Sequence, residues 1–339
     1  MNKSFIFPLH FPTFRDRMMM YIQVKKENAM TDLSMEILEK YQVRKSKAQK
    51  AQFQKMILAY AAERGYKARV EKRGKAENIV IGNPVSAKVI YAAHYDTPAV
   101  MPFPNLMIAK NRFIFTLYQL AVCILLYTVP LLIMFLGSSI AYRYTGSELV
   151  KAAVALFGYS LIFVVSLLIL AGPANRHNAN DNTSGVLALI EIMHLLPPEQ
   201  KEGVALLFFD LEELGCIGSR EFYTAHKNAL KSTPVINFDC IGDGSTIFLA
   251  PRKGAKHLKE KLEEAFEPSA DFSTEVALKS TFTNSDHRNF PLGVGVAAFK
   301  TSKHGILYGD RIHTNRDTVC DEKNVDFVAR CAVKLGEMI

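Results

Sequence analysis

The chain of 339 residues has no tryptophan, only five cysteines, and no repeated or low-complexity segment. Five is an odd and sparse cysteine count for this length, which excludes a scaffold held together by disulfides. The 19 glycines and 14 prolines show no periodicity, which excludes a collagen-like chain. A hydrophobic content of 49% excludes a disordered chain, and the length is sufficient to bury a large core.

Charge is almost missing from one internal stretch, residues 113–175. This stretch contains only three charged side chains, Arg143, Glu148 and Lys151. The uncharged runs 113–142 and 152–175 each exceed the ~20 residues with which a helix crosses the hydrocarbon core of a bilayer. We therefore interpret residues 113–175 as a two-helix transmembrane hairpin whose partner is the lipid bilayer. The alternative is a buried helical hairpin or a lid in an oligomer, and the hairpin could also associate with copies of itself in a homo-oligomer.

The amino-terminal segment lacks the apolar core of a secretory signal. Its longest early apolar run is Phe5–Phe7, so we expect no cleavable signal. Residues 1–75 carry 17 Lys and Arg against 7 Asp and Glu. We expect the basic run VRKSKAQKAQ to be a solvated face, with contact to anionic lipid as the alternative and no nucleic-acid partner. Together with the unpaired cysteines, these features favour an integral membrane protein whose soluble domain faces the cytoplasm.

Outside residues 113–175, short apolar runs alternate with helix-like segments. This alternation predicts an α/β fold, a three-layer domain with a mixed, mostly parallel central sheet flanked by helices. The nearly continuous apolar run KVIYAA, residues 88–93, is typical of a strand in the middle of such a sheet. We divide the chain into a basic amino-terminal helical segment, the first part of the domain, the hairpin insert and the second part of the domain, at residues 1–44, 45–112, 113–175 and 176–339.

Polar side chains that can bind metal follow several of the predicted strands. Active groups of a parallel α/β sheet gather at the carboxyl ends of its strands, so we expect these side chains to meet there. Taken singly, each has an ordinary interpretation, because an acidic residue after a strand is commonly a helix cap. The prediction rests on the whole set: His94, Asp96, Asp181, Glu212, Glu213, Asp239 and His313.

Two imidazoles and several carboxylates, with no cysteine among them, suit Zn²⁺, with Mn²⁺ or Co²⁺ as alternatives. Two metal ions ~3.5–4 Å apart need a bridging carboxylate. Counting ligands predicts one metal held by His94, Asp181 and Asp239, and a second held by Asp181, Glu213 and His313. Glu212 then remains free to act as the general base on a bridging water. The carboxylate of Asp96 could accept the other ring N–H of His94 and so fix its tautomer.

Six motifs occur in an order and relative placement that resemble family twenty-eight of the metallopeptidases. They cover roughly residues 45–98 and 176–339 and read HYDT, NDNTSG, EELGCIGS, NFD, SDH and IHTNRDT. The resemblance implies a domain with two zinc ions, the same five metal ligands, Glu212 as base and Asp96 as support for His94. It further implies that Asp286 and His287 lie near the site without binding metal, and that Tyr308 helps to polarise the scissile carbonyl.

The family contains aminopeptidases, glutamate carboxypeptidases and glutaminyl cyclases, so the resemblance leaves several activities open. We expect a membrane-anchored aminopeptidase that hydrolyses the amino-terminal bond of peptide substrates. A carboxypeptidase or dipeptidase would need cations for a substrate carboxylate, and the candidates are Lys300, Lys303 and Arg311. A cyclase with a single zinc would not need the full ligand set. An alternative of another class is a non-catalytic membrane binding module. The chain departs from the family pattern in the hairpin, which lies between HYDT and NDNTSG.

Overall fold

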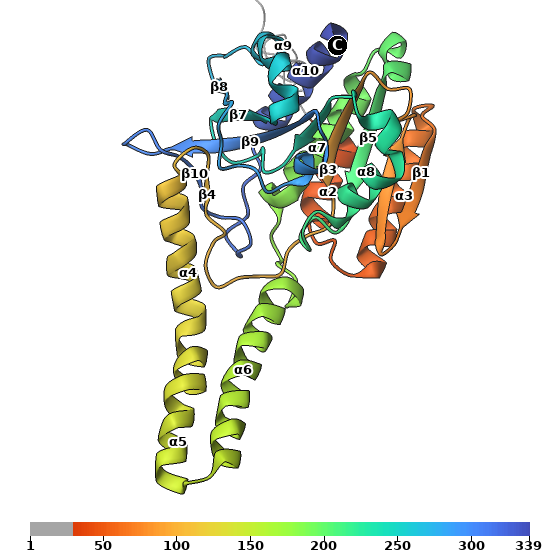
Figure 1. The fold of residues 1–339 in the computed structure, drawn as a ribbon. Helices are drawn as coiled ribbons and strands as arrows, with labels where there is room; N and C mark the ends of the chain where they lie inside the picture. Colours follow the sequence, from red (N-terminus) through yellow and green to blue (C-terminus); the bar gives the residue numbers. More distant parts are fainter. Residues whose placement is uncertain (1–29) are drawn as a thin grey trace, which may run out of the picture.

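The computed structural model describes residues 30–339, and Figure 1 shows a compact α/β domain from which two long helices extend. The expectation about a signal concerns residues 1–29, which lie outside the described residues. So does most of the basic segment 1–44.

The domain is built on a mixed sheet of ten strands in the order β1-β2-β5-β3-β6-β9-β10-β4, with β7 paired to β9 and β8 paired to β7. The pairs β5-β3, β3-β6 and β6-β9 at its centre are parallel, whereas β1, β2, β4 and β10 pair antiparallel. The strands are β1 (Ala68–Arg73), β2 (Ala76–Ile81), β3 (Val89–His94), β4 (Met107–Ile108), β5 (Val204–Phe209), β6 (Val235–Phe238), β7 (Thr246–Pro251), β8 (Ser273–Val276), β9 (Gly293–Thr301) and β10 (Leu307–Gly309).

Helices cover both faces of this sheet and confirm the expected three-layer α/β class. Side chains on one face, such as Tyr91 and Phe238, pack in one core with α2, α3, α7, α9 and α10. Side chains on the other face, such as Ile90 and Leu207, pack against Phe222 and Leu230 of α8. The helices of the domain are α2 (Asp32–Lys40), α3 (Lys47–Glu63), α7 (Gly185–Leu195), α8 (Ile217–Leu230), α9 (Lys259–Ala265) and α10 (Glu322–Met338), with a π-helical segment η2 (Ala179–Ser184) before α7 and 3-10 turns η3 (Pro198–Gly203), η4 (Lys253–Leu258) and η5 (Asp286–Asn289).

The predicted strand KVIYAA is β3, which lies between β5 and β6 with every residue buried. A strand covered on both faces must be apolar at each position, which is why its sequence does not alternate. Residues 41–46 separate α2 from α3. Arg44 in this segment is fully buried, so the basic run there is not wholly the solvated face that its charge suggested.

The insert forms two long helices that run side by side away from the domain (Figure 1). The first is continuous over Arg112–Thr145 and consists of α4 (Arg112–Leu132), the π-helical η1 (Ile133–Gly137) and α5 (Ser138–Thr145); the second is α6 (Glu148–Ala171). Pro130 cannot donate a backbone hydrogen bond, and the π-helical segment begins three residues after it. Gly158 of α6 allows close packing here, since a Cβ would lie 2.6 Å from the backbone of Met134. Both helices are long and apolar enough to cross a membrane.

Candidate metal centre

The carboxyl ends of the central parallel strands bring the predicted ligands to one edge of the sheet. β3 ends at His94, which pairs with Phe209 at the end of β5. Glu212 and Glu213 follow β5 within a few residues, and Asp239 is the first residue after β6. Asp181 lies in η2, which follows the hairpin, and His313 lies in the loop after β10. Five separate segments of the chain therefore converge at this edge.

The first ligand group is formed by His94, Asp181 and Asp239, all of them buried, with ligand atoms within 4.8 Å of one another. The Nε2 atom of His94 lies 3.4 Å from Oδ1 of Asp181 and 3.6 Å from Oδ1 of Asp239. The Nδ1 atom of the same ring lies 3.1 Å from the carbonyl oxygen of Asp96. Because that oxygen can only accept, Nδ1 carries a proton, which leaves Nε2, between the two carboxylates, as the atom that would bind a cation. Three electron-pair donors facing one another form a site for a cation.

The second ligand group contains Asp181, Glu213 and His313, again with ligand atoms within 4.8 Å of one another. Nε2 of His313 lies 3.1 Å from Oδ2 of Asp181 and 3.5 Å from Oε2 of Glu213. The other oxygen of Glu213, Oε1, is buried without a hydrogen-bond partner among the described residues. Asp181 offers its Oδ1 to the first ligand group and its Oδ2 to the second. The structure brings together the two ligand sets that counting predicted, with the same carboxylate shared between them.

The charges of the cluster fit cations. Burial would lower the pKa of His94, but the carboxylates of Asp181, Asp239 and Asp96 outweigh it and raise that pKa well above its usual range. Burial likewise raises the pKa of Glu213 well above its ordinary value, and the negative charges of Asp181 and Glu212 add to this effect. Divalent cations among such carboxylates would stabilise their ionised forms and lower their pKa again. The donor set, all oxygen and imidazole nitrogen, fits zinc.

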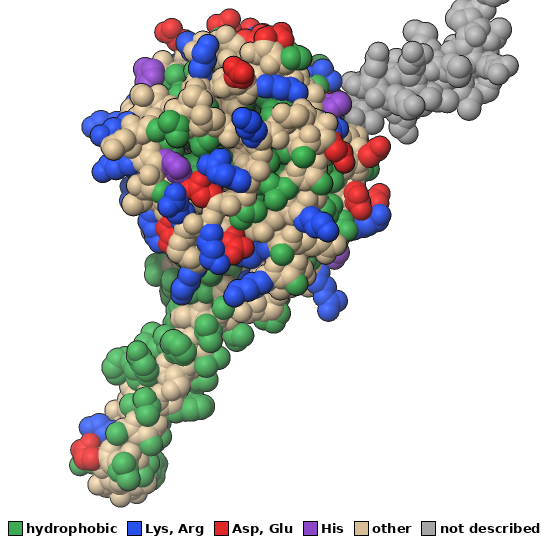
Figure 2. Space-filling model, turned by 90° about the vertical axis from the view of Figure 1, so that its right-hand side faces the viewer, with side chains coloured by type: hydrophobic (Ala, Val, Ile, Leu, Met, Phe, Trp, Pro, Cys, Tyr) green, Lys and Arg blue, Asp and Glu red, His purple; other side chains and the backbone are tan. Residues whose placement is uncertain are grey.

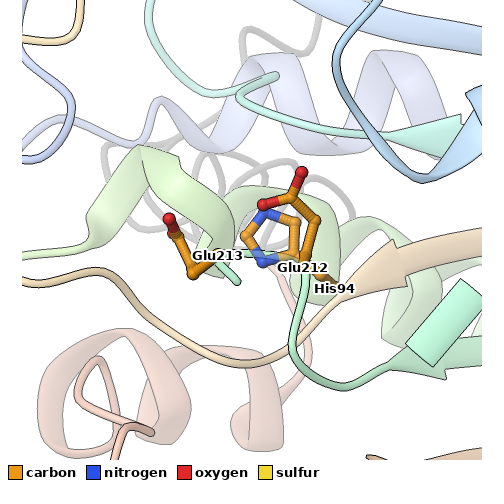
Figure 3. Close-up of side chains that lie close together, drawn as sticks. All are labelled: His94, Glu212 and Glu213. Atoms are coloured by element: carbon orange, nitrogen blue, oxygen red, sulfur yellow. The ribbon is translucent and has the colours of Figure 1, made fainter. Parts of the chain in front are cut away.

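Glu212 lies beside both groups. Figure 3 shows Glu212 and Glu213 with His94, and the ligand atoms of these three residues also lie within 4.8 Å of one another. Burial raises the pKa of Glu212 well above its usual range, with Asp239 and Asp286 adding to the shift and His94 opposing it. One oxygen of Glu212 accepts a hydrogen bond from the thiol of Cys216 at 3.3 Å. Distance alone is therefore compatible with Glu212 as a proton acceptor and with Glu212 as a further ligand.

Asp96 supports the cluster differently from the sequence-based expectation. Its carboxylate accepts hydrogen bonds from the backbone N–H groups of Glu212 at 3.0 Å and Glu213 at 3.2 Å. It lies 3.7 Å from Nδ1 of His94, whereas the carbonyl oxygen of Asp96 is closer to that atom. The carboxylate of Asp96 thus holds the loop that carries both glutamates, and its backbone orients His94.

The sequence NANDNTSG places the bridging aspartate by a series of hydrogen bonds. Asp317, which the motif IHTNRDT contains but to which no role was assigned, accepts from the backbone N–H groups of Asn180 at 2.9 Å and Asp181 at 3.0 Å. The side chain of Asn182 accepts from the N–H of Cys240 and donates to the carbonyl of Phe238, so it fixes η2 to the end of β6. Burial raises the pKa of Asp317 to about 8, and the charge of Asp181 adds to the shift.

Backbone strain also concentrates at this site. Among residues 30–339, positive φ angles at non-glycine positions occur at Leu211, Cys216, Cys240 and His313. Leu211 precedes Glu212, Cys240 follows Asp239, and His313 is itself a predicted ligand. Residues other than glycine rarely adopt a positive φ angle, so the surrounding contacts must hold these four residues in place.

Arg44 is a site-supporting residue that the sequence reasoning missed. Its guanidinium donates to the carbonyls of Tyr95 and Tyr41 and to the hydroxyl of Thr183. Burial lowers the pKa of Arg44 to about 10, and the nearby charges of Asp96 and Asp181 oppose the change. Arg44 therefore joins the segment before α3 to the motifs HYDT and NDNTSG, through Tyr95 and Thr183. It stands in a basic run with no neighbouring acidic signal, so the sequence offers no way to distinguish it from its solvated neighbours.

The three residues implied only by the family resemblance do not line the cavity at the cluster. Asp286 is buried and accepts a hydrogen bond from Ser219, and burial raises its pKa to about 7. His287 is also buried, which lowers its pKa to about 4. Tyr308 pairs with Ile108 through β10 and β4 and packs under Lys300, so the structure does not support its expected contact with the scissile carbonyl.

The cluster opens into a cavity of about 480 Å³. The ligands and Glu212 form its acidic wall. The rest is mostly apolar and includes residues from the segment before α4, from the hairpin and from the loop before η5, among them Leu106, Met107, Phe115, Leu170, Phe282, Phe299 and Ile312. No lysine or arginine of the described part of the chain lines this cavity.

Comparison with known proteins gives the family. Residues 166–334 match peptidase family M28. The chain is similar to the Legionella pneumophila LapA aminopeptidase, with a TM-score of 0.55 and 13% identity over 99% of this chain and 76% of that one. It is also similar to glutaminyl cyclases of Porphyromonas gingivalis (TM-score 0.52, 16% identity, 91% of this chain, 99% of that one) and Macrostomum lignano (0.53, 12%, 99% and 96%). No curated protein matches the chain.

At these identities the solved structures show the shared fold alone. The family match covers the segment that contains Asp181, Glu213, Asp239 and His313, and it agrees with the family resemblance of the six motifs. The chain therefore belongs to peptidase family M28.

Proposed function

We propose that this protein is a membrane-anchored, zinc-dependent aminopeptidase with two metal ions. The observation that carries the proposal is a single cavity in which two ligand groups share Asp181, with Glu212 beside them. His94, Asp181 and Asp239 would hold one ion, and Asp181, Glu213 and His313 the other. The chain shares its fold with a solved aminopeptidase.

Each residue of the site has its own role in the proposed amide hydrolysis. When bound, two zinc ions would supply a water of lowered pKa and polarise the carbonyl of the scissile peptide bond. Glu212 accepts the proton of the attacking water and passes it to the leaving amine. Burial raises the pKa of Glu212 well above its usual range, and bound cations would lower that pKa again and so favour the ionised form that a general base needs. Asp96 holds Glu212 and Glu213 at the backbone throughout.

The described lining of the cavity favours a substrate amino group over a substrate carboxylate, because a carboxylate would need a cationic side chain there. Four acidic side chains line the cavity, and none of the described lysines and arginines does. Lys300 instead forms ion pairs with Asp243 and Asp310, and Arg311 pairs with Asp243 at 3.4 Å. Of the cations considered for a carboxypeptidase, these two are therefore neutralised by carboxylates outside the cavity. An exopeptidase at this site is best suited to a free amino terminus.

The activity is tested with aminoacyl-p-nitroanilides, peptides blocked at the amino terminus and peptides with an amino-terminal glutamine. We expect hydrolysis only of substrates with a free amino group, and loss of more than nine-tenths of the rate on treatment with a chelator, with recovery on addition of Zn²⁺. Cleavage of blocked peptides alone would support a carboxypeptidase. Release of ammonia from amino-terminal glutamine without peptide cleavage would support a glutaminyl cyclase. If the metal-loaded protein reacted with none of these substrates, the proposed enzymatic function would be contradicted.

We also propose that residues 113–175 anchor the protein in a bilayer. Figure 2 shows the protruding hairpin covered with hydrophobic side chains, with charged groups at its tip. Only 6% of the most apolar window of each helix is buried, which argues against a buried hairpin. Large side chains such as Phe113 and Leu125 are 76% and 69% exposed. Exposed apolar surface of this extent is stable in lipid and not in water.

The domain is proposed to face the cytoplasm. In sealed right-side-out vesicles, external protease should leave the domain intact, and lysis of the vesicles should expose it to digestion. The connection between Thr145 and Glu148 is too short to serve as a reliable cleavage site, so an antibody tag placed at the carboxyl terminus gives the readout. Digestion of the tag from outside intact vesicles would show that the domain faces outward and would contradict the proposed orientation.

A further inference from the structure

The hairpin is part of the wall of the catalytic cavity. Phe115 and Gln119, four residues apart on one face of α4, line the cavity together with Leu170 near the end of α6. The same cavity is lined by the predicted metal ligands His94, Asp181, Asp239 and His313. A segment that served only as an anchor would not need to reach the reacting groups.

Short, hydrogen-bonded connections fix the hairpin to the site. Before α4, the backbone N–H of Met101 donates to the carbonyl of His313 at 2.7 Å, and that of Asn105 donates to Ile312 at 3.2 Å. After α6, Pro173 accepts a hydrogen bond from the N–H of Val100 at 2.8 Å. The connection before α4 therefore joins the loop that carries the predicted ligand His313, and the connection after α6 joins the connection before α4. The cavity and the base of the hairpin form one unit.

Helix length places this base at the membrane surface. Lys151 marks the far end of the apolar part of α6, and Leu170 is the penultimate residue of that helix. At 1.5 Å per residue the distance between them is about 28 Å, close to the ~30 Å thickness of the hydrocarbon core. Leu170 therefore lies at the near edge of the hydrocarbon. The first helix is ten residues longer than α6, 34 against 24, so its first turns, with Phe115 and Gln119, stand at the level of the lipid headgroups.

Cationic side chains surround the same end of the domain. Figure 2 shows several Lys and Arg side chains on the domain where the hairpin emerges. Arg112 is the first residue of α4, Lys110 lies two residues before it, and Arg176 follows α6 by a few residues. Basic residues at this position favour contact with anionic headgroups. They support a bilayer surface that lies against the domain close to the cavity.

We propose that this enzyme takes its substrates from the bilayer surface: peptides held there by an amphipathic segment, whose free amino terminus enters the cavity along Phe115, Gln119 and Leu170. This inference rests on the proposed peptidase function and narrows its substrate class. The peptide's apolar side chains contact the hairpin wall, and its amino group faces the acidic wall opposite. Adsorption restricts the peptide to the plane in which the cavity lies, which raises its effective concentration.

The test uses full-length protein in vesicles of phosphatidylcholine with a minor fraction of phosphatidylglycerol. Two peptides share the same three amino-terminal residues and the same overall composition. In one peptide the rest forms an amphipathic helix, and in the other the same residues are scrambled so that no apolar face exists. We expect kcat/KM for release of the first residue to be at least ~10-fold higher for the amphipathic peptide. A ratio near one would overturn the proposal.

Variants of the hairpin separate contact with the wall from adsorption alone. Phe115→Gln should lower kcat/KM for the amphipathic peptide at least ~5-fold. The matched control Leu117→Gln, on the same helix, 55% exposed and outside the cavity lining, should change it less than twofold. Equal effects of the two substitutions would show that the hairpin wall does not contact the substrate, and would overturn its assigned role.

A binding measurement keeps this inference separate from the proposed activity. In Cys123→Ser protein with Glu212→Gln to prevent turnover, a cysteine introduced by Phe115→Cys is labelled with a charged maleimide. The amphipathic peptide should slow labelling at least ~5-fold, the scrambled peptide should not, and a Leu117→Cys control should be unaffected by either. If the peptide protects the cysteine but the unsubstituted protein does not hydrolyse it, the binding surface is supported and the peptidase function is contradicted. If the unsubstituted protein hydrolyses the peptide but the cysteine is not selectively protected, the peptidase function is supported and the binding surface is contradicted.

Discussion

Replacement of Glu212 by glutamine is expected to lower kcat by about 10²–10⁴-fold, the range that a general base contributes. The amide has nearly the same shape as the carboxylate but cannot accept the proton of the attacking water. Zinc content should stay unchanged, because Glu212 is assigned to neither ligand pair around Asp181. The measurement is the rate on a free-amine p-nitroanilide together with zinc per chain by mass spectrometry.

Glu213→Gln is the matched control for this prediction. It stands next to Glu212 on the same loop, and its Oε2 lies 3.5 Å from Nε2 of His313. We expect it to lose zinc as well as activity. If Glu212→Gln also lost zinc, Glu212 would be a ligand, as its proximity to His94 and Glu213 allows. Turnover near that of the unsubstituted protein would exclude Glu212 as the base.

Replacement of Asp181 by alanine is expected to abolish detectable turnover and to reduce zinc content from two ions per chain to less than one. Asp181 contributes one oxygen to each ligand group, so its loss removes a ligand from both. It also leaves His94, Asp239, Glu213 and His313 without the carboxylate between them. Zinc titration followed by calorimetry, with mass spectrometry for stoichiometry, gives the result.

His313→Ala provides the comparison, because it removes a ligand from the second group only. This variant should keep one tightly bound zinc ion and lose the other. Retention of two tightly bound ions by Asp181→Ala would contradict the bridging role. Circular dichroism of both variants checks that the domain remains folded, since the backbone N–H of Asp181 also donates a hydrogen bond to the carboxylate of Asp317.

The class of the fold followed from local sequence patterns. Runs such as KVIYAA and VALLFFD are apolar at every position because strands in the centre of a parallel sheet are buried on both faces. The same logic placed His94, Glu213 and Asp239 at the carboxyl ends of their strands. The hairpin was equally clear, because a long stretch without charge is a local property of the chain. These features depend on the residues of each segment alone.

Other parts of the site could not be predicted, because they depend on contacts between distant segments. The burial of Arg44 arises only when its guanidinium meets Tyr95 and Thr183 from elsewhere in the chain. The carboxylate of Asp96 was expected beside His94, but the packed loop offers it two backbone N–H groups instead. Strands β4 and β10 are too short to leave a periodic pattern, so the sequence did not show that Tyr308 of β10 lies against Lys300.

The sequence by itself thus determined the α/β class, the apolar hairpin and the residue types of the metal centre, since each is written in a local run or a short motif. Only the tertiary structure decided that Asp181 gives one oxygen to each ligand group and that Phe115, Gln119 and Leu170 share a cavity with the ligands. The physical reason is that Asp181 is separated from the other ligands by a 63-residue insert or by whole strands and helices. Their distances are set by how those elements pack against one sheet.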